Sequence, residues 1–174
     1  MTAVSTIRMG FIEAEDRLLI DFVYPDEVVS LQATRRITRR MIHGLAQVLA
    51  ESSAVAKRVP HSHKIEMLVF EHLSALQPTS GPAGDGVPAT QDHAQQPWPL
   101  LQQLHVVPQP SSFSLRFTSA IGGDVAMEVS REELHRMVAT FRQLARHAEW
   151  DIDAAIPWLI EADSPLPAPG RLLS

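Results

Sequence analysis

The chain has 174 residues, of which 45% are hydrophobic and 20% charged, and its net charge is −5. This is the composition of a globular protein long enough to bury a core. The absence of cysteine excludes disulfide bonds, thiolate nucleophiles and cysteine metal sites. No window approaches the about 18 consecutive apolar residues of a membrane span, and residues 1–10 lack the pattern of a secretory signal. We therefore expect no membrane partner and a cytoplasmic location.

The first predicted elements are two short strands, over residues 7–14 and 17–23, joined as a hairpin by an acidic turn. Side chains alternate along the second strand, so that one face is apolar and the other mixed. The segment 24–27, with the sequence Tyr-Pro-Asp-Glu, breaks this strand. Ser30 is the predicted N-cap of a long helix that ends near Glu51.

This helix carries a strongly basic outer side within an acidic protein. Residues 31–60 contain six basic residues and one acidic residue, a net charge of +5. At 100° per residue, the helix places an apolar stripe opposite its basic side chains. The stripe comprises Ile37, Met41, Gly44, Leu45, Val48 and Leu49, and the basic side comprises Arg35, Arg36, Arg39, Arg40 and His43. Because Gly44 lies within the apolar stripe, we predict that another backbone approaches it closely.

A second helix and a long insertion are predicted next. Residues 65–76 have the apolar spacing of a helix. Residues 78–99 are rich in proline, glycine and polar side chains, so we predict a flexible insertion that cannot repay the entropy of its ordering. The Pro-rich residues 164–174 predict a mobile C-terminal end.

The second half of the chain has the clearest pattern. Ser130 and Glu133 form a capping box, which predicts a helix that begins there and ends near Glu149. Alternating apolar side chains predict three strands before it, over residues 101–107, 112–118 and 125–129. Four arginines spread around the helix are interpreted as a solubilising pattern: Arg131, Arg136, Arg142 and Arg146.

Together these elements predict a single α+β domain over residues 1–163, interrupted by the insertion. The expected core is an antiparallel sheet of about five strands, with two long amphipathic helices packed against one face. Each half contains a strand-hairpin and helix unit, in the order ββαα and then βββα. A sheet covered on one face leaves the other to water or to a partner, so we also expect a homodimer or a complex.

The histidines give little indication of a metal or catalytic site. His61 and His63, with His72, could be zinc ligands, but no Asp, Glu or Cys stands at an obvious completing position, and we interpret them as loop or surface residues. His135 and His147, 12 residues apart on one helix, are predicted to be ordinary surface residues. No nucleophile elbow, phosphate-binding loop or dinucleotide motif is present. We therefore predict a protein that is not an enzyme and holds no cofactor or metal.

The basic helix is the feature that offers a partner surface, because arginine gives bidentate donors to carboxylates and phosphates. Our first hypothesis is a non-enzymatic interaction or accessory subunit of a larger cytoplasmic assembly, which binds an acidic protein through Arg35, Arg36, Arg39, Arg40 and His43. The alternative is a nucleic-acid-binding protein that contacts phosphates through the same arginines; the acidic remainder of the chain and the lack of nearby aromatic residues weigh against it. A solvated face that only keeps the protein soluble is a third interpretation. A metal-dependent enzyme built on His61, His63 and His72 ranks last.

Overall fold

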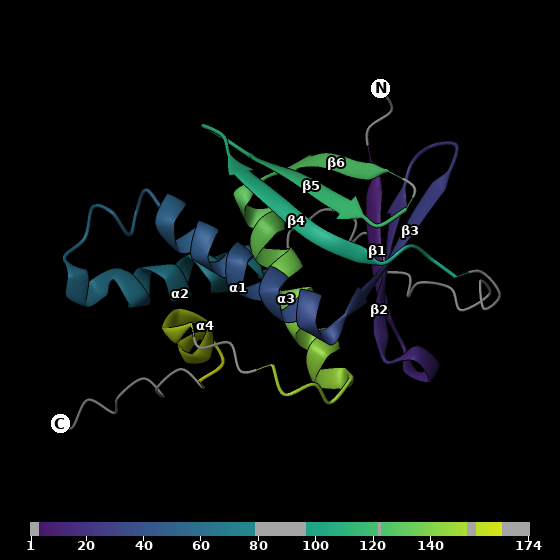
Figure 1. Cartoon of the computed structure of the whole chain (residues 1–174). Helices are drawn as coiled ribbons and strands as arrows, with labels where there is room; N and C mark the ends of the chain where they lie inside the picture. The colour runs from purple at the N-terminus through teal and green to yellow at the C-terminus, as the bar shows by residue number, and fades with distance from the viewer. Residues whose placement is uncertain (1–3, 79–96, 122, 153–155, 165–174) are drawn as a thin grey trace.

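The computed structural model describes residues 4–78, 97–121, 123–152 and 156–164 (Figure 1). The first of two three-stranded antiparallel sheets comprises β1 (Thr6–Ile12), β2 (Arg17–Val23) and β3 (Val28–Thr34). The second comprises β4 (Leu101–Pro108), β5 (Phe113–Ser119) and β6 (Asp124–Val129). The helices are α1 (Arg35–Ser52), α2 (Lys64–Ala75), α3 (Arg131–His147) and α4 (Pro157–Ala162), and the 3₁₀ turns are η1 (Glu13–Glu15) and η2 (His61–His63).

The α+β class is confirmed, but the single sheet of about five strands is wrong, because the described residues form two sheets of three strands. The strands predicted in the second half agree with β4, β5 and β6 to within one residue at each end. The capping box is also confirmed, since the Ser130 hydroxyl accepts from the Glu133 N–H at 3.1 Å and the Glu133 carboxylate accepts from the Ser130 N–H at 2.7 Å. α3 ends at His147, two residues before the predicted end.

The missing strand in the sequence-based prediction is β3. Its residues Val29, Leu31 and Ala33 alternate with more polar ones and pair with Phe22, Ile20 and Leu18 of β2, which gives one continuous apolar face. The segment 24–27 is a tight reversal, closed by the Tyr24 N–H to the Glu27 carbonyl at 2.8 Å, rather than the approach to a helix. Ser30 is therefore not the N-cap of α1; Thr34 is, and its hydroxyl accepts from the Ile37 N–H at 3.4 Å.

With β3 included, the two halves of the chain have more similar element orders than the sequence predicted. Each contains three antiparallel strands followed at once by a long helix with a hydroxyl N-cap, Thr34 for α1 and Ser130 for α3. The order is therefore βββα in both, with α2 added after the first unit. The two units therefore share the order of their elements and a hydroxyl side chain as the N-cap of the long helix.

The two units share one core. The sheets meet through the rings of Phe22 on β2 and Phe117 on β5, whose centroids are 4.8 Å apart. A single parallel bridge also joins Gln32 of β3 to Leu100, just before β4. α1 and α3 lie side by side against both sheets, while α2 and α4 pack together at the end of the helical layer away from the first sheet (Figure 1). Every helix in the described residues is too short or too polar to cross a membrane.

Two predicted regions lie mostly outside the described residues. Of the insertion 78–99, the structure describes Pro78 and residues 97–99, and the Pro99 carbonyl accepts from the Gln32 N–H at 2.9 Å. Of the predicted mobile end 164–174, it describes Ser164.

Gly44 does not mark a close approach of two backbones. The residue is exposed, and a Cβ built on it would meet no atom within 4 Å. The structure therefore overturns the prediction of a close backbone approach at this position, because α1 faces an open groove there.

We expect Gly44→Ala to raise the free energy of unfolding by about 0.5–1 kcal/mol, because alanine lowers the entropy of the unfolded chain and favours the helix. Chemical denaturation of the two proteins measures the difference. A destabilised variant would mean that this part of α1 is packed more tightly than the structure shows.

Candidate partner-binding surface

The basic face of α1, formed by Arg35, Arg36, Arg39 and Arg40, is open to solvent. All four residues are exposed, and His43 on the same helix is half-buried. In the part of the chain that the structure describes, none of the four forms an ion pair with a carboxylate. Arg35 donates to the backbone carbonyl of Asp151 at 3.4 Å. Among the described residues, no carboxylate is therefore ion-paired with the positive charges of this face.

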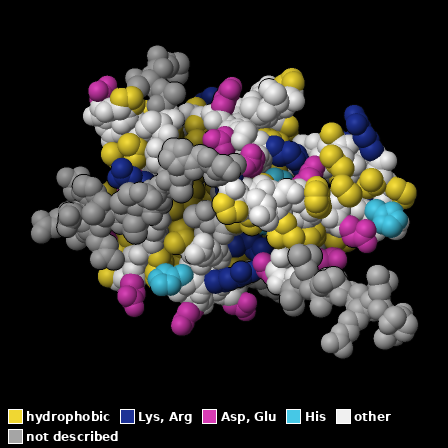
Figure 2. Space-filling model, turned by 180° about the vertical axis from the view of Figure 1, so that it is seen from behind, with side chains coloured by type: hydrophobic (Ala, Val, Ile, Leu, Met, Phe, Trp, Pro, Cys, Tyr) yellow, Lys and Arg dark blue, Asp and Glu magenta, His cyan; other side chains and the backbone are white. Residues whose placement is uncertain are grey.

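Most of the other described arginines are ion-paired, although Arg8 and Arg58 form no ion pair within the described residues. Six form ion pairs with a carboxylate: Arg17, Arg116, Arg131, Arg136, Arg142 and Arg146. The face turned away from the viewer in Figure 1 accordingly shows basic and acidic side chains interspersed (Figure 2). The interpretation of the α3 arginines as merely solubilising is wrong, because Arg142 and Arg146 both hold Asp163, just after α4.

The four arginines of the basic face point toward two sides of α1. Arg36 and Arg40 are four residues apart, and their row on the helix surface continues to Gly44. Arg35 and Arg39 form a second row, about 100° further around the helix. The second row lies toward the segment after α3, as the contact of Arg35 with Asp151 shows.

A groove of about 440 Å³ separates α1 from β4, beside the first of these rows. Its α1 side carries Arg40 at the rim, with Gly44 leaving the wall hollow because no side chain fills that position. Acidic side chains are absent from the described residues that line it: Ile37, Arg40, Met41, Gly44 and Leu45 from α1, and Gln102, Gln103, Leu104 and Val106 from β4. The groove therefore combines apolar side chains from α1 and β4 with the amides of Gln102 and Gln103 and the basic Arg40 at its rim.

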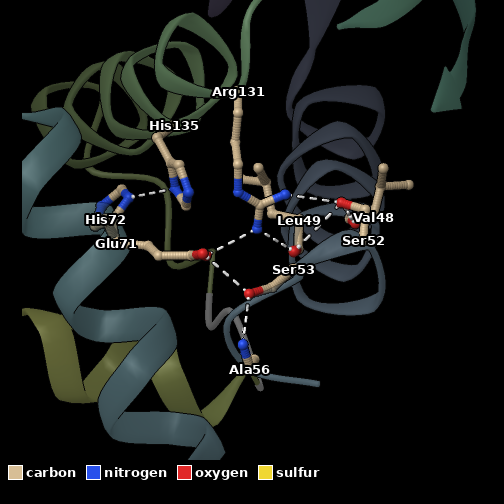
Figure 3. A network of polar contacts seen from close by, with 9 residues as sticks. All are labelled: Val48, Leu49, Ser52, Ser53, Ala56, Glu71, His72, Arg131 and His135. Carbon is tan, nitrogen blue, oxygen red and sulfur yellow. Dashed lines mark hydrogen bonds and ion pairs between the residues drawn. The ribbon is translucent and has the colours of Figure 1, made fainter. Parts of the chain in front are cut away.

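A second polar cluster is partly buried where α1, α2 and α3 meet (Figure 3). The Arg131 guanidinium on α3 donates to the Glu71 carboxylate on α2 at 2.9 Å, to the Ser52 hydroxyl at 2.9 Å and to the Leu49 carbonyl at 2.6 Å. The Glu71 carboxylate also accepts from the Ser53 hydroxyl at 3.0 Å. One arginine thus ties together the C-terminal end of α1, the middle of α2 and the start of α3.

Next to Arg131 lies a buried histidine pair. The Nδ1 atoms of His72 and His135 are 3.1 Å apart, so one ring donates and the other accepts, which requires opposite tautomers. Burial lowers the pKa of His72 to about 4, and the nearby Arg142 charge adds to the shift while Asp163 opposes it. Burial likewise lowers the pKa of His135 to about 3, with contributions from His72 and Arg131. Both rings are therefore neutral at pH 7.

The prediction that His135 is a surface residue is wrong, since only 1% of it is exposed. His72 is buried with it and packs against Trp158 of α4, at 5.3 Å between ring centroids. His61 and His63 are exposed and do not join His72. In the part of the chain that the structure describes, no group of three or more acidic, histidine or cysteine side chains is placed to hold a metal ion.

A spacing signal for the buried pair was present in the sequence. Arg131, His135 and Arg142 follow one another at intervals of four and seven residues, which places them on one side of α3. α2 and α4 pack against this polar side of α3, in addition to the contacts that α3 makes through its apolar stripe. A helix wheel separates apolar from polar residues, so it assigned this polar side to solvent.

A further exposed surface is apolar. The side chains of Phe70 on α2 and Ile160 on α4 are 65% and 52% exposed, and Ile65 and Leu76 near the ends of α2 are partly exposed as well. Hydrophobic side chains gather over this end of the molecule (Figure 2). The predicted homodimer stays a prediction.

Comparison with known proteins found no matching family model, no similar curated protein and no similar solved structure.

Proposed function

We propose that this protein is a non-enzymatic interaction or accessory subunit of a larger assembly, which binds an acidic protein surface through the basic face of α1. The observation that carries the proposal is that four exposed arginines gather on one face of α1 with no carboxylate partner among the described residues, whereas six of the eight other described arginines are ion-paired. In a chain of net charge −5, a local cluster of guanidinium groups with no ion pair among the described residues attracts an acidic partner and sets its orientation.

The groove beside the basic face favours a protein partner over nucleic acid. Its floor is formed by aliphatic side chains and methionine, and aromatic side chains on which bases would stack are absent from its described lining. Protein interfaces combine an apolar centre with a charged rim, which is the arrangement of Met41, Leu104 and Arg40 here.

The test is affinity capture from a lysate of the native host after nuclease treatment. We expect the variant R35Q/R36Q/R39Q/R40Q to lose the proteins that the wild type retains, with an apparent Kd raised about tenfold or more. Its melting temperature should change by less than about 2 °C, because exposed charges contribute little to folding.

A matched control removes four basic residues outside the basic face, as K57Q/R58Q/K64Q/R116Q. It has the same net charge as the test variant and should retain the partner. Equal loss in both variants, or loss in neither, would contradict the proposal. Binding of the wild type to a DNA duplex with a steep salt dependence that disappears in the first variant would instead support the nucleic-acid alternative.

A further inference from the structure

We propose that the groove between α1 and β4 takes an extended, acidic peptide segment of the partner, which pairs with β4 as an additional strand. The inference rests on the proposed function and specifies which part of the partner binds. It follows from three observations on the described residues around this groove: a strand edge with no partner along its length, apolar side chains at alternate positions of that strand, and a basic rim with no ion-paired carboxylate.

The free edge belongs to β4. In the second sheet the strand order is β4-β5-β6, so along its length β4 pairs with β5 alone among the described strands. The bridge to the first sheet involves Leu100, before β4 begins. In Figure 1 β4 is the strand of its sheet nearest to α1, so its unpaired side borders the groove. A strand edge of this kind offers a row of backbone N–H and C=O groups to an incoming chain.

β4 also lacks the side chains that normally protect an edge. Its sequence, LQQLHVVP, contains no Lys, Arg, Asp or Glu, whereas the opposite edge of the same sheet, β6, carries Asp124 and Glu128. Charged side chains on an edge strand oppose the addition of another strand. β4 has a proline only at its end, Pro108, and an irregular register only at its start, between Leu101 and Gln103. The middle of β4 is therefore open to pairing.

The β4 side of the groove presents apolar side chains at the two-residue period of a strand. Leu104 and Val106 are two residues apart and lie on the same face of β4, toward α1. A neighbouring strand would place every second side chain on that face, above Ile37, Met41 and Leu45 of α1. The hollow at Gly44 leaves room for one of these side chains, since a Cβ there would meet nothing within 4 Å.

The basic rim of the groove determines that the bound peptide segment should be acidic. Arg40 lines the groove and Arg36 stands one turn before it, and neither is paired with a carboxylate within the described part of the chain. The β4 side contributes amides from Gln102 and Gln103 and no charge. A strand whose outward side chains are acidic would satisfy both arginines while its inward side chains are buried.

The test uses synthetic peptides of about ten residues, the length of a long strand. The first alternates glutamate with valine, the second alternates glutamate with serine, and the third is the first peptide with alternate backbone nitrogens methylated. We expect the first to bind below millimolar Kd and to slow amide hydrogen exchange at residues 103–107 of β4. The second and third should each bind at least about tenfold more weakly, because one loses the apolar contacts and the other the main-chain hydrogen bonds.

Variants of the protein test whether the peptide binds in the groove between α1 and β4. R36Q/R40Q should weaken binding of the first peptide about tenfold, whereas R35Q/R39Q removes the same charge from the far row and should weaken it less than about threefold. Gly44→Leu retains all arginines but fills the hollow, and should also weaken binding about tenfold. Circular dichroism and denaturation of each variant verify that the fold is retained.

The outcomes separate this inference from the proposed function. If the first and second peptides bind equally, or Gly44→Leu has no effect while the quadruple arginine variant loses its partner, the groove inference is overturned and the charge-based function stands. If the partner is retained by the quadruple arginine variant as well, both are overturned. Equal effects of R36Q/R40Q and R35Q/R39Q would place the partner on the whole face of α1 rather than in the groove, and would also overturn the inference.

Discussion

Replacing Arg131 by methionine is expected to lower the free energy of unfolding by about 3 kcal/mol. The variant leaves the Glu71 carboxylate without its cation, and it removes the 2.6 Å hydrogen bond from Arg131 to the Leu49 carbonyl near the end of α1. The Glu71 side chain is only 15% exposed, so water replaces the lost contacts poorly. Removing one partner of a largely buried ion pair typically costs about 3–5 kcal/mol, and partial exposure of Arg131 places this case at the lower end.

Arg131→Lys distinguishes charge from geometry. Lysine keeps the positive charge, and its one nitrogen can replace Nη2 between the Leu49 carbonyl and the Glu71 carboxylate, but it has no second nitrogen for the Ser52 hydroxyl, so we expect about half of the loss. Arg116→Gln is the control, because Arg116 and Asp124 form an exposed pair at 3.6 Å and should contribute less than about 0.5 kcal/mol. Urea denaturation followed by circular dichroism measures all three. A loss below about 1 kcal/mol in Arg131→Met would contradict the role assigned to this junction.

The elements that sequence reasoning located well are those with a local signal. The capping box of Ser130 and Glu133 and the alternation of β5 both depend on contacts within a few residues, and both are where the pattern placed them. β3 was missed because its flanking signals conflicted: a Pro-containing turn before it and a serine within it resemble the start of a helix. The pairing of Val29 with Phe22 makes this segment a strand, and that pairing depends on tertiary structure.

In the candidate site as well, some features follow from local sequence and others depend on segments far apart in the chain. The exposure of the four arginines follows from the amphipathic pattern of α1. The groove beside them depends on how β4 packs against α1, and residues 102–106 are more than fifty positions away in the chain. Ion pairing of the α3 arginines likewise depends on partners from α2 and on Asp163, so their spacing alone gave the wrong interpretation.

The buried histidine pair should make the protein unstable to mild acid. Both rings have a folded-state pKa below the ordinary value of 6.5, so below pH 6.5 the unfolded chain binds more protons than the folded protein. Stability is therefore full above about pH 6.5 and falls as the pH decreases toward 4. Each histidine contributes a slope of up to about 1.4 kcal/mol per pH unit, so the pair should cost on the order of 4 kcal/mol by pH 4.5.

The double variant H72L/H135L tests this, because it removes both partners of the hydrogen bond together and leaves neither ring unpaired. We expect its stability at pH 7 to lie within about 1 kcal/mol of the wild type, and its stability to fall less between pH 6.5 and 4.5. The control H61Q/H63Q removes two exposed histidines and should retain the wild-type pH dependence. Carboxylates destabilise all three proteins alike in acid, so the difference between the variants isolates the pair. Parallel stability curves for the wild type and H72L/H135L would show that His72 and His135 titrate alike in the folded and unfolded chains, contrary to their burial between α2, α3 and Trp158.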